Sequence, residues 1–583
     1  MSRSETDPAS AGGPPTAERP APAFPVEIAE GWADDPAERE LTAAGGGAAG
    51  VEVPAAAGEA AAPAGSSVRA VVGKAAMIIL AATLAGRLLG LVRDIVMADL
   101  FGRQAETDAF FLAYRLPYLL ALVVSSGLVA AFVPLFSHRI ATGQKKDALG
   151  LFANMGKVAG LVLVGLTVIL VVVAPWVVPL IGFGFTSETK HLAVYLFRIV
   201  MTGFVFAGLT GLVTGMLNSL RRFALAAFSS VIGAAVALVV MVALAKPIGI
   251  TSLAVSMAVS YFAGFAVVMF GIRDQDVPYR SRIQWRDPAL REAAGMVWPV
   301  LIGSAVGAVA IFSDQIMGSM LSVGSVSSLS YADKLFQLPL GLFVAGITVP
   351  LFPLLSEQVA AKAPDRVKAT LSFALRLMAF LLFPIMVAFI LLRFAITGLI
   401  YQHGEFTAAD TSPTAWVLLF LLLGLYVYAG RDTLTRVFYA YHDMRTPVKI
   451  SVATVVLNIG LSYLFMQFLG VGGLALGTTV SLTINFFVLL YLLRRKIGPM
   501  GLRRMVGSFA RVAGASAVMG VAVWLVDMAL TRVVSATTSG FAVRVVAGLV
   551  VGVAVYLIAA TLVRSPELAE VKDMFRAMLK RRR

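Results

Sequence analysis

The chain has 583 residues, of which 58% are hydrophobic and only 14% are charged, and its mean hydropathy is +0.85. One soluble domain cannot hide that much apolar surface, so the composition excludes an ordinary soluble protein and predicts that lipid covers much of the chain. The formal net charge is +15, and cysteine is absent, which excludes a disulfide framework and thiol chemistry.

The first 68 residues differ from the rest of the chain. They are rich in Ala, Gly and Pro and contain eleven acids and three bases. They lack the basic start and apolar run of a signal peptide, and they cannot bury enough apolar surface to fold. The sequence therefore predicts a disordered cytoplasmic tail over residues 1–68. The remainder carries +23, with its bases in short loops between apolar stretches, which favours membrane orientation over nucleic-acid binding.

Long apolar stretches follow this tail, and they have the length of helices rather than of barrel strands. We expect an all-α polytopic membrane protein with about fourteen transmembrane helices. The expected spans are residues 72–97, 108–136, 148–182, 190–218, 223–245, 248–272, 290–322, 328–357, 366–400, 410–441, 447–469, 472–493, 505–530 and 540–563.

The loops between these spans predict the orientation. With the N-terminus inside, the inner loops and the C-terminal tail hold 26 Lys and Arg residues. The outer loops hold four, which are Arg103, Lys190, Lys246 and Arg532. Cytoplasmic loops carry the excess of positive charge, so we expect the N- and C-termini to be cytoplasmic and the number of spans to be even.

An internal repeat divides the spans into two halves. The tetrapeptide VPLF at residues 133–136 recurs at 349–352, and short matches at residues 253–260 recur at 474–481. About six spans fit in one period, and an even number makes the halves parallel. We expect an N-lobe over 69–273 (spans 1–6), a cytoplasmic linker over 274–289 and a C-lobe over 290–495 (spans 7–12). Two further helices over 496–563 and a basic cytoplasmic tail over 564–583 complete the predicted domains.

Ionisable residues inside spans are costly, so each is a candidate for function or for a structural pair. The interpretation as structural charges fits those near span ends or standing alone, which are Lys74, Lys157, Arg198, Arg376 and Arg393. The functional interpretation fits Arg87, Arg93 and Lys334, which the repeat places on facing lobes. Asp108 opens the second span, and Arg115 lies two turns deeper on the same face. Cations at such a cavity suit a phosphate, which accepts forked guanidinium hydrogen bonds.

Several ordered motifs contain these residues. Residues 86–94 read GRLLGLVRD, 101–102 read FG, 107–111 read TDAFF, 131–134 read AFVP and 331–334 read YADK. Residues 402–407 read QHGEFT, and FYA at 438–440 precedes RTPVK at 445–449. Together, over residues 70–500, these motifs resemble those of the MurJ/MviN lipid II flippases, a family of the multidrug/oligosaccharidyl-lipid/polysaccharide exporter superfamily.

The resemblance implies a fourteen-span, two-lobe flippase that moves undecaprenyl-diphosphate-linked peptidoglycan precursor (lipid II) across the bacterial inner membrane for cell-wall synthesis. It implies that Arg87, Arg93, Asp108 and Lys334 line the substrate cavity. Two departures stand out. Ala121 and Leu122 occupy positions where the family carries a basic pair, for which we expect Arg115 to compensate. Lys334 replaces an arginine and loses the bidentate fork.

Alternatives remain open at this point. A polysaccharide-lipid flippase or a drug/cation exporter of the same superfamily would share the fold, although an exporter of cations would present acids to the cavity. A membrane-embedded transferase would need clustered acids and histidines, and the four histidines lie far apart. We expect a transporter without a cofactor rather than an enzyme. Its partners are a lipid-linked anionic substrate, the bilayer and cell-wall synthesis proteins. Because no GxxxxGK[ST] loop occurs, uphill transport would draw on an ion gradient, the membrane potential or a partner.

Overall fold

The computed structural model describes residues 67–341 and 345–570, and all of its regular elements there are helices. Residues 1–66 of the predicted tail and most of the basic C-terminal tail lie outside these residues, and α2 begins within the last two positions of the predicted tail. The helices are α2 (Ser67–Phe101), α3 (Ala105–Ala141), α4 (Lys145–Ile181), α5 (Ser187–Ser219), α6 (Phe223–Ile248), α7 (Thr251–Phe270), α8 (Pro288–Ser319), α9 (Ser325–Pro339), α10 (Ala345–Ala360), α11 (Pro364–Leu391), α12 (Arg393–Tyr401), α13 (Ala408–Leu423), α14 (Leu425–Ala440), α15 (Arg445–Leu469), α16 (Val471–Ile497), α17 (Leu502–Val533) and α18 (Thr538–Leu562).

Many of these helices can cross a membrane. Within the described residues, ten are long and apolar enough, and α13 with α14, bent by 43° at their junction, gives an eleventh if the pair is one span. The all-α membrane fold is thus confirmed, whereas the count of fourteen is not. α2, which carries Arg87, Arg93 and Asp94, is not among these ten. The predicted spans 366–400 and 410–441 are each two helices, because a helix ends near residue 392 and another near residue 424. The predicted span 328–357 includes residues 342–344, which lie outside the described residues.

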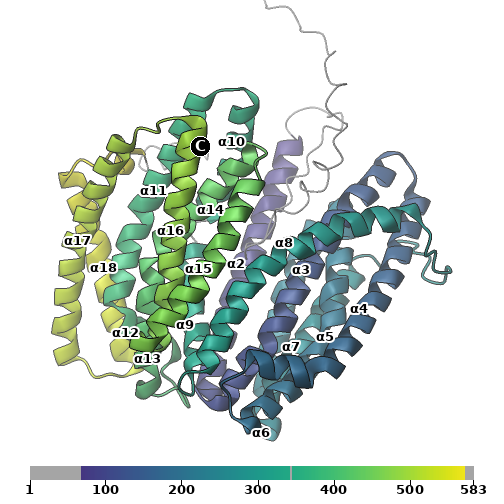
Figure 1. Cartoon of the computed structure of the whole chain (residues 1–583), viewed down its shortest axis with the longest axis horizontal. Helices are drawn as coiled ribbons and strands as arrows, with labels where there is room; N and C mark the ends of the chain where they lie inside the picture. Colours follow the sequence, from purple (N-terminus) through teal and green to yellow (C-terminus); the bar gives the residue numbers. More distant parts are fainter. Residues whose placement is uncertain (1–66, 342–344, 571–583) are drawn as a thin grey trace, which may run out of the picture.

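The helices form two bundles that lie side by side (Figure 1). α2 to α7 form the N-lobe, and α8 to α16 form the C-lobe. In the N-lobe α3 packs on α5, α6 on α7 and α2 on α6; in the C-lobe α9 packs on α13, α15 on α16 and α8 on α15. These are the pairings that a parallel repeat predicts. The last two helices, α17 and α18, pack on each other and on α11, outside both repeats.

The turns provide a second sign of the repeat. Four turns of the N-lobe contain a residue with positive φ, and the matching turns of the C-lobe do too. The pairs lie 219 to 222 positions apart and are Gly102 with Gly324, Gly143 with Lys362, Arg221 with His442, and Gly249 with Gly470. Gly249 and Gly470 also share their ψ, at −138° and −133°. A left-handed conformation at matching positions indicates that the two halves follow the same backbone path.

The lobes meet along α2, α3, α8 and α9. α8 packs on α3 and α4 of the N-lobe as well as on α15, and α2 also contacts α12 of the C-lobe. Aromatic side chains fill the junction, with the rings of Tyr331, Tyr401 and Phe406 packed together and Phe111 against Tyr331. Tyr331 and Tyr401 are fully buried. This packing fixes the position of α9, which carries Lys334 toward the N-lobe.

Candidate functional site between the lobes

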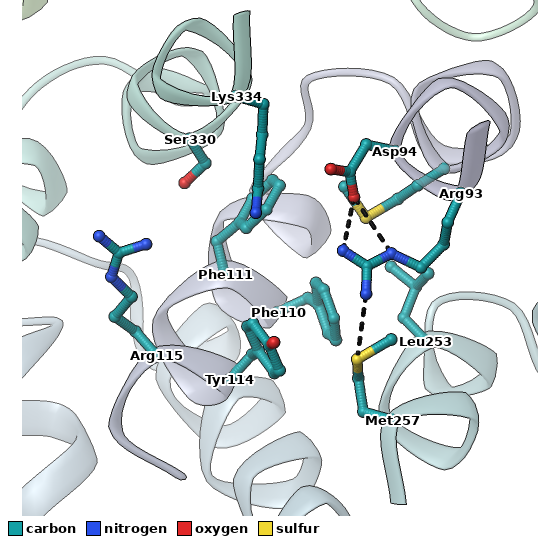
Figure 2. A pocket seen from close by; sticks show the side chains of 11 residues that line it. Arg93, Asp94, Phe110, Phe111, Tyr114, Arg115, Leu253, Met257, Ser330 and Lys334 are labelled. Carbon is teal, nitrogen blue, oxygen red and sulfur yellow. Dashed lines mark hydrogen bonds and ion pairs between the residues drawn. The ribbon is translucent and has the colours of Figure 1, made fainter. Parts of the chain in front are cut away.

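A cavity lies between the lobes, at the point where four helices converge (Figure 2). Its polar and sulfur-bearing lining includes Arg93 and Asp94 from α2, Tyr114 and Arg115 from α3, Met257 from α7 and Lys334 from α9. The charged lining residues are three cations and one acid, so the cavity carries a net positive charge. Arg93, Arg115 and Lys334 come from distant parts of the sequence, and the structure brings them to one space.

Arg93 is held in place by its neighbour. Its Nη2 and Nε donate to Asp94 Oδ1 at 2.7 and 3.1 Å, and Nη1 lies 3.6 Å from the Met257 sulfur. Asp94 is 3% exposed, so the pair is shielded from solvent and weakly screened. The Arg93 guanidinium is therefore held in a fixed orientation toward the cavity, and Asp94 neutralises part of its positive charge.

Arg115 and Lys334 approach the cavity from opposite lobes (Figure 2). Arg115 Nε is buried and has no hydrogen-bond partner among the described residues. Lys334 forms no ion pair or hydrogen bond in that part of the chain. Asp314 of α8 is near enough for its charge to act on Arg115, but it forms no ion pair within 4 Å. Partly buried cations with unused donors are costly unless an anion or water satisfies them.

Arg87 lies outside the lining of this cavity. It stands six residues before Arg93, about 9 Å along α2. It is exposed, and its guanidinium reaches across to the C-lobe, where it contacts Gly341 at the end of α9. A Cβ atom on Gly341 would lie 1.6 Å from Arg87 Nη1, so the glycine is what permits this approach. Arg87 thus faces the space between the lobes at another level than the other cations.

Asp108 has a different environment from the cavity residues. Its carboxylate accepts the backbone N–H of Gly324 at 2.6 Å and that of Ser327 at 2.7 Å, and also the Ser327 hydroxyl. These donors belong to the first turn of α9, so Asp108 of the N-lobe caps a helix of the C-lobe. The structure places Asp108 in a contact that joins the lobes, and it does not line the cavity with Arg93, Arg115 and Lys334.

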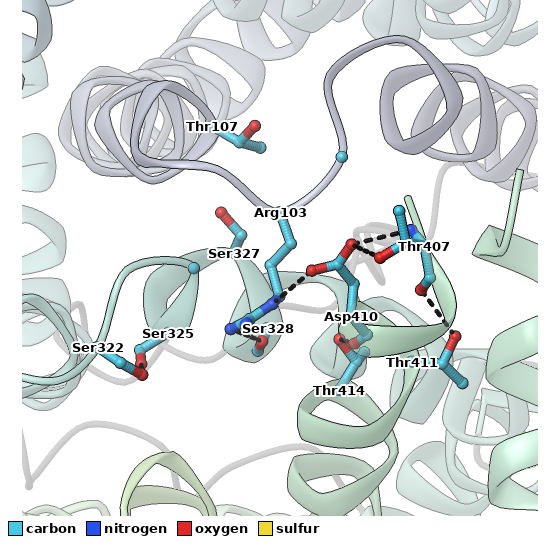
Figure 3. A network of polar contacts seen from close by, with 12 residues as sticks. Arg103, Thr107, Ser322, Ser325, Ser327, Ser328, Thr407, Asp410, Thr411 and Thr414 are labelled. Carbon is cyan, nitrogen blue, oxygen red and sulfur yellow. Dashed lines mark hydrogen bonds and ion pairs between the residues drawn. The ribbon is translucent and has the colours of Figure 1, made fainter. Parts of the chain in front are cut away.

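More contacts close the same end of the molecule (Figure 3). Arg103 forms an ion pair with Asp410 at 3.1 Å and donates to the Ser328 hydroxyl at 3.3 Å. The Tyr331 hydroxyl donates to the Gly102 carbonyl at 3.1 Å. In the sequence Arg103 stands out only as a loop charge. No local signal relates it to Asp410, because the two residues are 307 positions apart.

Two glycines allow backbone segments from different parts of the chain to come into contact at this closed end. A Cβ on Gly404 would lie 2.2 Å from the Asp99 carbonyl, beside the hydrogen bond from Glu405 N to that carbonyl. A Cβ on Gly184 would lie 2.4 Å from the Ser319 carbonyl. Backbone meets backbone at both places, so only glycine fits. The end that bears the predicted outer loops is therefore tightly closed.

The charges interpreted as structural have partners within the protein. Lys157 donates to Ser281, and Arg376 pairs with Glu567 at 2.9 Å. Arg198 donates to the Val171 carbonyl at 3.2 Å, and Arg393 donates to the Ile390 carbonyl at 2.7 Å. The Val171 carbonyl is free because residue 175, four positions on, is a proline without an N–H. The Lys74 side chain lies outside the described residues.

No group of three His, Cys, Asp or Glu side chains in the described part of the chain is placed to hold a metal ion. The expectation that transport needs no cofactor stays a prediction. The arrangement is suited to binding an anion between two lobes, since its donors are cationic and come from each side.

Comparisons with known proteins agree with this arrangement. The family model described as lipid II flippase MurJ matches residues 97–563. A probable lipid II flippase MurJ of Vibrio cholerae is 30% identical over 477 residues, covering 79% of this chain and 90% of that protein. The lipid II flippase MurJ of Burkholderia cenocepacia is 29% identical, covering 71% and 82%.

Solved structures give the same result. A lipid II flippase MurJ in an inward closed conformation superposes with a TM-score of 0.71 at 25% identity, covering 83% of this chain and 98% of that one. An inward-facing multidrug resistance transporter of the MATE family superposes with a TM-score of 0.60 at 15% identity, covering 73% and 98%, which shows the shared fold alone. This multi-pass membrane protein therefore belongs to the lipid II flippase MurJ family.

Proposed function

We propose that this protein translocates lipid II, the undecaprenyl-diphosphate-linked peptidoglycan precursor, from the cytoplasmic to the outer leaflet of the bacterial inner membrane. Membership of the MurJ family supports this function, and so does the cationic cavity. The protein is a transporter and not an enzyme, so no bond of the substrate is made or broken. The observation that carries the proposal is the convergence of Arg93, Arg115 and Lys334 from two lobes on one space.

The asymmetry of the molecule suggests how the cavity is reached. The contacts of Asp108 and Arg103 close the end that bears the four outer-loop bases of the sequence. If the positive loops and both termini are cytoplasmic, the closed end faces outward and the cavity is approached from the cytoplasm. Transport then requires that the closed end separate while the other end comes together, which is alternating access.

The placement of the cations gives the substrate a role in this change. Arg115 on the N-lobe and Lys334 on the C-lobe repel each other when no anion lies between them. A diphosphate held by both would replace that repulsion with attraction and would favour the lobes' approach. A ligand shifts a conformational equilibrium only through such differential contacts. The lipid tail stays in the bilayer during the movement of the headgroup.

The energy source is part of the proposal. The substrate headgroup is anionic, so we propose that an ion gradient or the membrane potential drives its movement. Docking of cell-wall synthesis proteins to the cytoplasmic tails is a further expectation that the described residues do not address.

Complementation tests the function. The chain is expressed in a bacterium depleted of its own lipid II flippase, and growth and the accumulation of lipid-linked precursor are measured. We expect growth to return and the precursor pool to fall to its normal level. Rescue must fail for the Arg93→Ala variant at equal membrane abundance. Export of a polysaccharide lipid or of cationic drugs, with the precursor still accumulating, would contradict the proposal and favour another transporter of the superfamily.

A further inference from the structure

The segment between α7 and α8, here called the interlobe linker (residues 271–287), is fastened to the N-lobe. Asn154 of α4 makes two hydrogen bonds with the Gln284 backbone, at 3.1 and 2.9 Å. Lys157 donates to the Ser281 carbonyl at 2.5 Å and to its hydroxyl at 2.8 Å. At the linker's start Asp274 forms an ion pair with Arg222. The linker therefore moves with the N-lobe, although it leads into the C-lobe.

These anchors fix the depth of the linker along α4. Lys157 is twelve residues from the start of α4 at Lys145, about 18 Å along the axis. The charge-free part of α4 begins at the next residue and runs to its end at Ile181, which is long enough to cross the hydrocarbon core. The linker thus lies where the hydrocarbon core begins, while the turn between α3 and α4 projects beyond it into water.

The exposed side chains of the linker have the chemistry of a membrane interface. Arg280, Arg282 and Arg286 are exposed and form no ion pair within the described residues. Tyr279 and Trp285 are 52% and 61% exposed, which is unusual for such large rings unless they lie at headgroup level. Trp285 and Arg286 also line an open groove at the start of α8.

The acids of the linker do not cancel these cations. The guanidinium of Arg222 hydrogen-bonds Asp274 and lowers the pKa of that carboxyl to about 2. The negative charge of Asp274 is therefore neutralised by Arg222 and not by the exposed arginines. Asp287 accepts the Ala289 N–H and caps α8. Asp276 remains exposed. The arginines therefore give the outward surface of the linker a net positive charge.

We propose that the interlobe linker is a binding surface for anionic phospholipid headgroups, with Arg280, Arg282 and Arg286 on the phosphates and Tyr279 and Trp285 in the interface. A guanidinium donates two parallel hydrogen bonds to a phosphate, and polybasic segments at a membrane attract anionic lipids. The depth of the linker favours lipid over a soluble protein partner. The surface is separate from the cavity that we assign to lipid II, and its binding of lipid holds the N-lobe against the bilayer surface as the C-lobe moves.

Fluorescence quenching in nanodiscs tests the proposal with the full-length protein. The chain has no cysteine, so Gln284→Cys accepts a single bimane label on a side chain that makes none of the anchoring bonds. Phosphatidylglycerol or phosphatidylcholine, brominated near the headgroup end of the acyl chain, is added at equal mole fraction. We expect brominated phosphatidylglycerol to quench at least about twofold more strongly. The preference should fall as salt screens the charges.

Matched variants assign the effect. R280Q/R282Q/R286Q should quench equally with the two lipids, whereas R139Q/K145Q/K146Q, which removes the same charge from the projecting turn, should keep the preference. A label at Lys146→Cys should be quenched weakly by either lipid. Equal quenching of the unmodified linker by the two lipids would overturn the proposal. Absence of quenching by both would overturn it too, and would favour a soluble partner. If the triple variant misfolds, the salt dependence of the native linker decides.

Discussion

Removing the Asp108 carboxylate should open the closed end of the molecule. In the structure this group is 2% exposed and accepts two backbone N–H groups and one hydroxyl from the first turn of α9. Asp108→Ala leaves these donors without a partner when the end is closed, while water satisfies them when it is open. Charged hydrogen bonds contribute about 1.5–3 kcal/mol each, and part of that is offset because a buried carboxylate is itself costly.

We therefore expect Asp108→Ala to lower the closed-to-open ratio by a net of about 2–3 kcal/mol, or roughly 30- to 150-fold. Cysteines at Gln104 and Glu405, whose side chains lie 3.5 Å apart across the lobes, report the closed state by the rate of cross-linking with a short bifunctional thiol reagent. Glu106→Gln is the control, since Glu106 is an exposed acid of the same helical turn. Cross-linking at the same rate in Asp108→Ala and in the control would refute this reasoning.

Three further predictions concern the cavity and the orientation. Lys334→Arg should support growth in the complementation assay because the charge is kept and a fork is gained, whereas Lys334→Ala should not; normal growth of the alanine variant would argue against a cationic cavity. Arg115→Ala should raise the precursor pool, because the Arg115 guanidinium, whose Nε has no partner, takes the place of the absent basic pair. If this variant has no effect, the compensation hypothesis is wrong, but the cationic cavity formed by Arg93 and Lys334 is not contradicted. Single cysteines at Val323 and Thr407 should react with an impermeant reagent in intact cells and one at Arg280 should not; labelling of Arg280 from outside would contradict the proposed orientation.

The helices were predictable because lipid demands long apolar stretches, and α4 to α7 follow them within a few residues. The positions where these helices break were not predictable. The Gly424 bend lies inside a stretch that stays apolar, so the hydropathy of the sequence does not mark it. A helix that borders a polar cavity, such as α2 with Arg87 and Arg93, is less apolar than one that faces lipid, so hydropathy marks it more weakly.

The cavity was predictable to the extent that the repeat places residues. The repeat predicted that Arg87, Arg93 and Lys334 face one space; Arg93 and Lys334 line one cavity, whereas Arg87 lies outside its lining. It could not show that Asp108 caps α9, because the donors come from Gly324 and Ser327, more than 200 positions away in the chain. Nor could it show that Arg103 closes the same end. Contacts between lobes depend on how two bundles dock, and no local pattern encodes that.

The central claim is that the cations between the lobes bind the diphosphate of lipid II. Native mass spectrometry of the protein in nanodiscs, titrated with lipid II, measures that binding directly. R93A/R115A/K334A should bind at least about tenfold more weakly than the unmodified chain, because charged hydrogen bonds to the phosphates are lost. Arg198→Gln, which removes a cation that is bonded to the Val171 carbonyl and is not part of the cavity lining, should bind normally. Equal affinity of the triple variant and the unmodified chain would contradict the account.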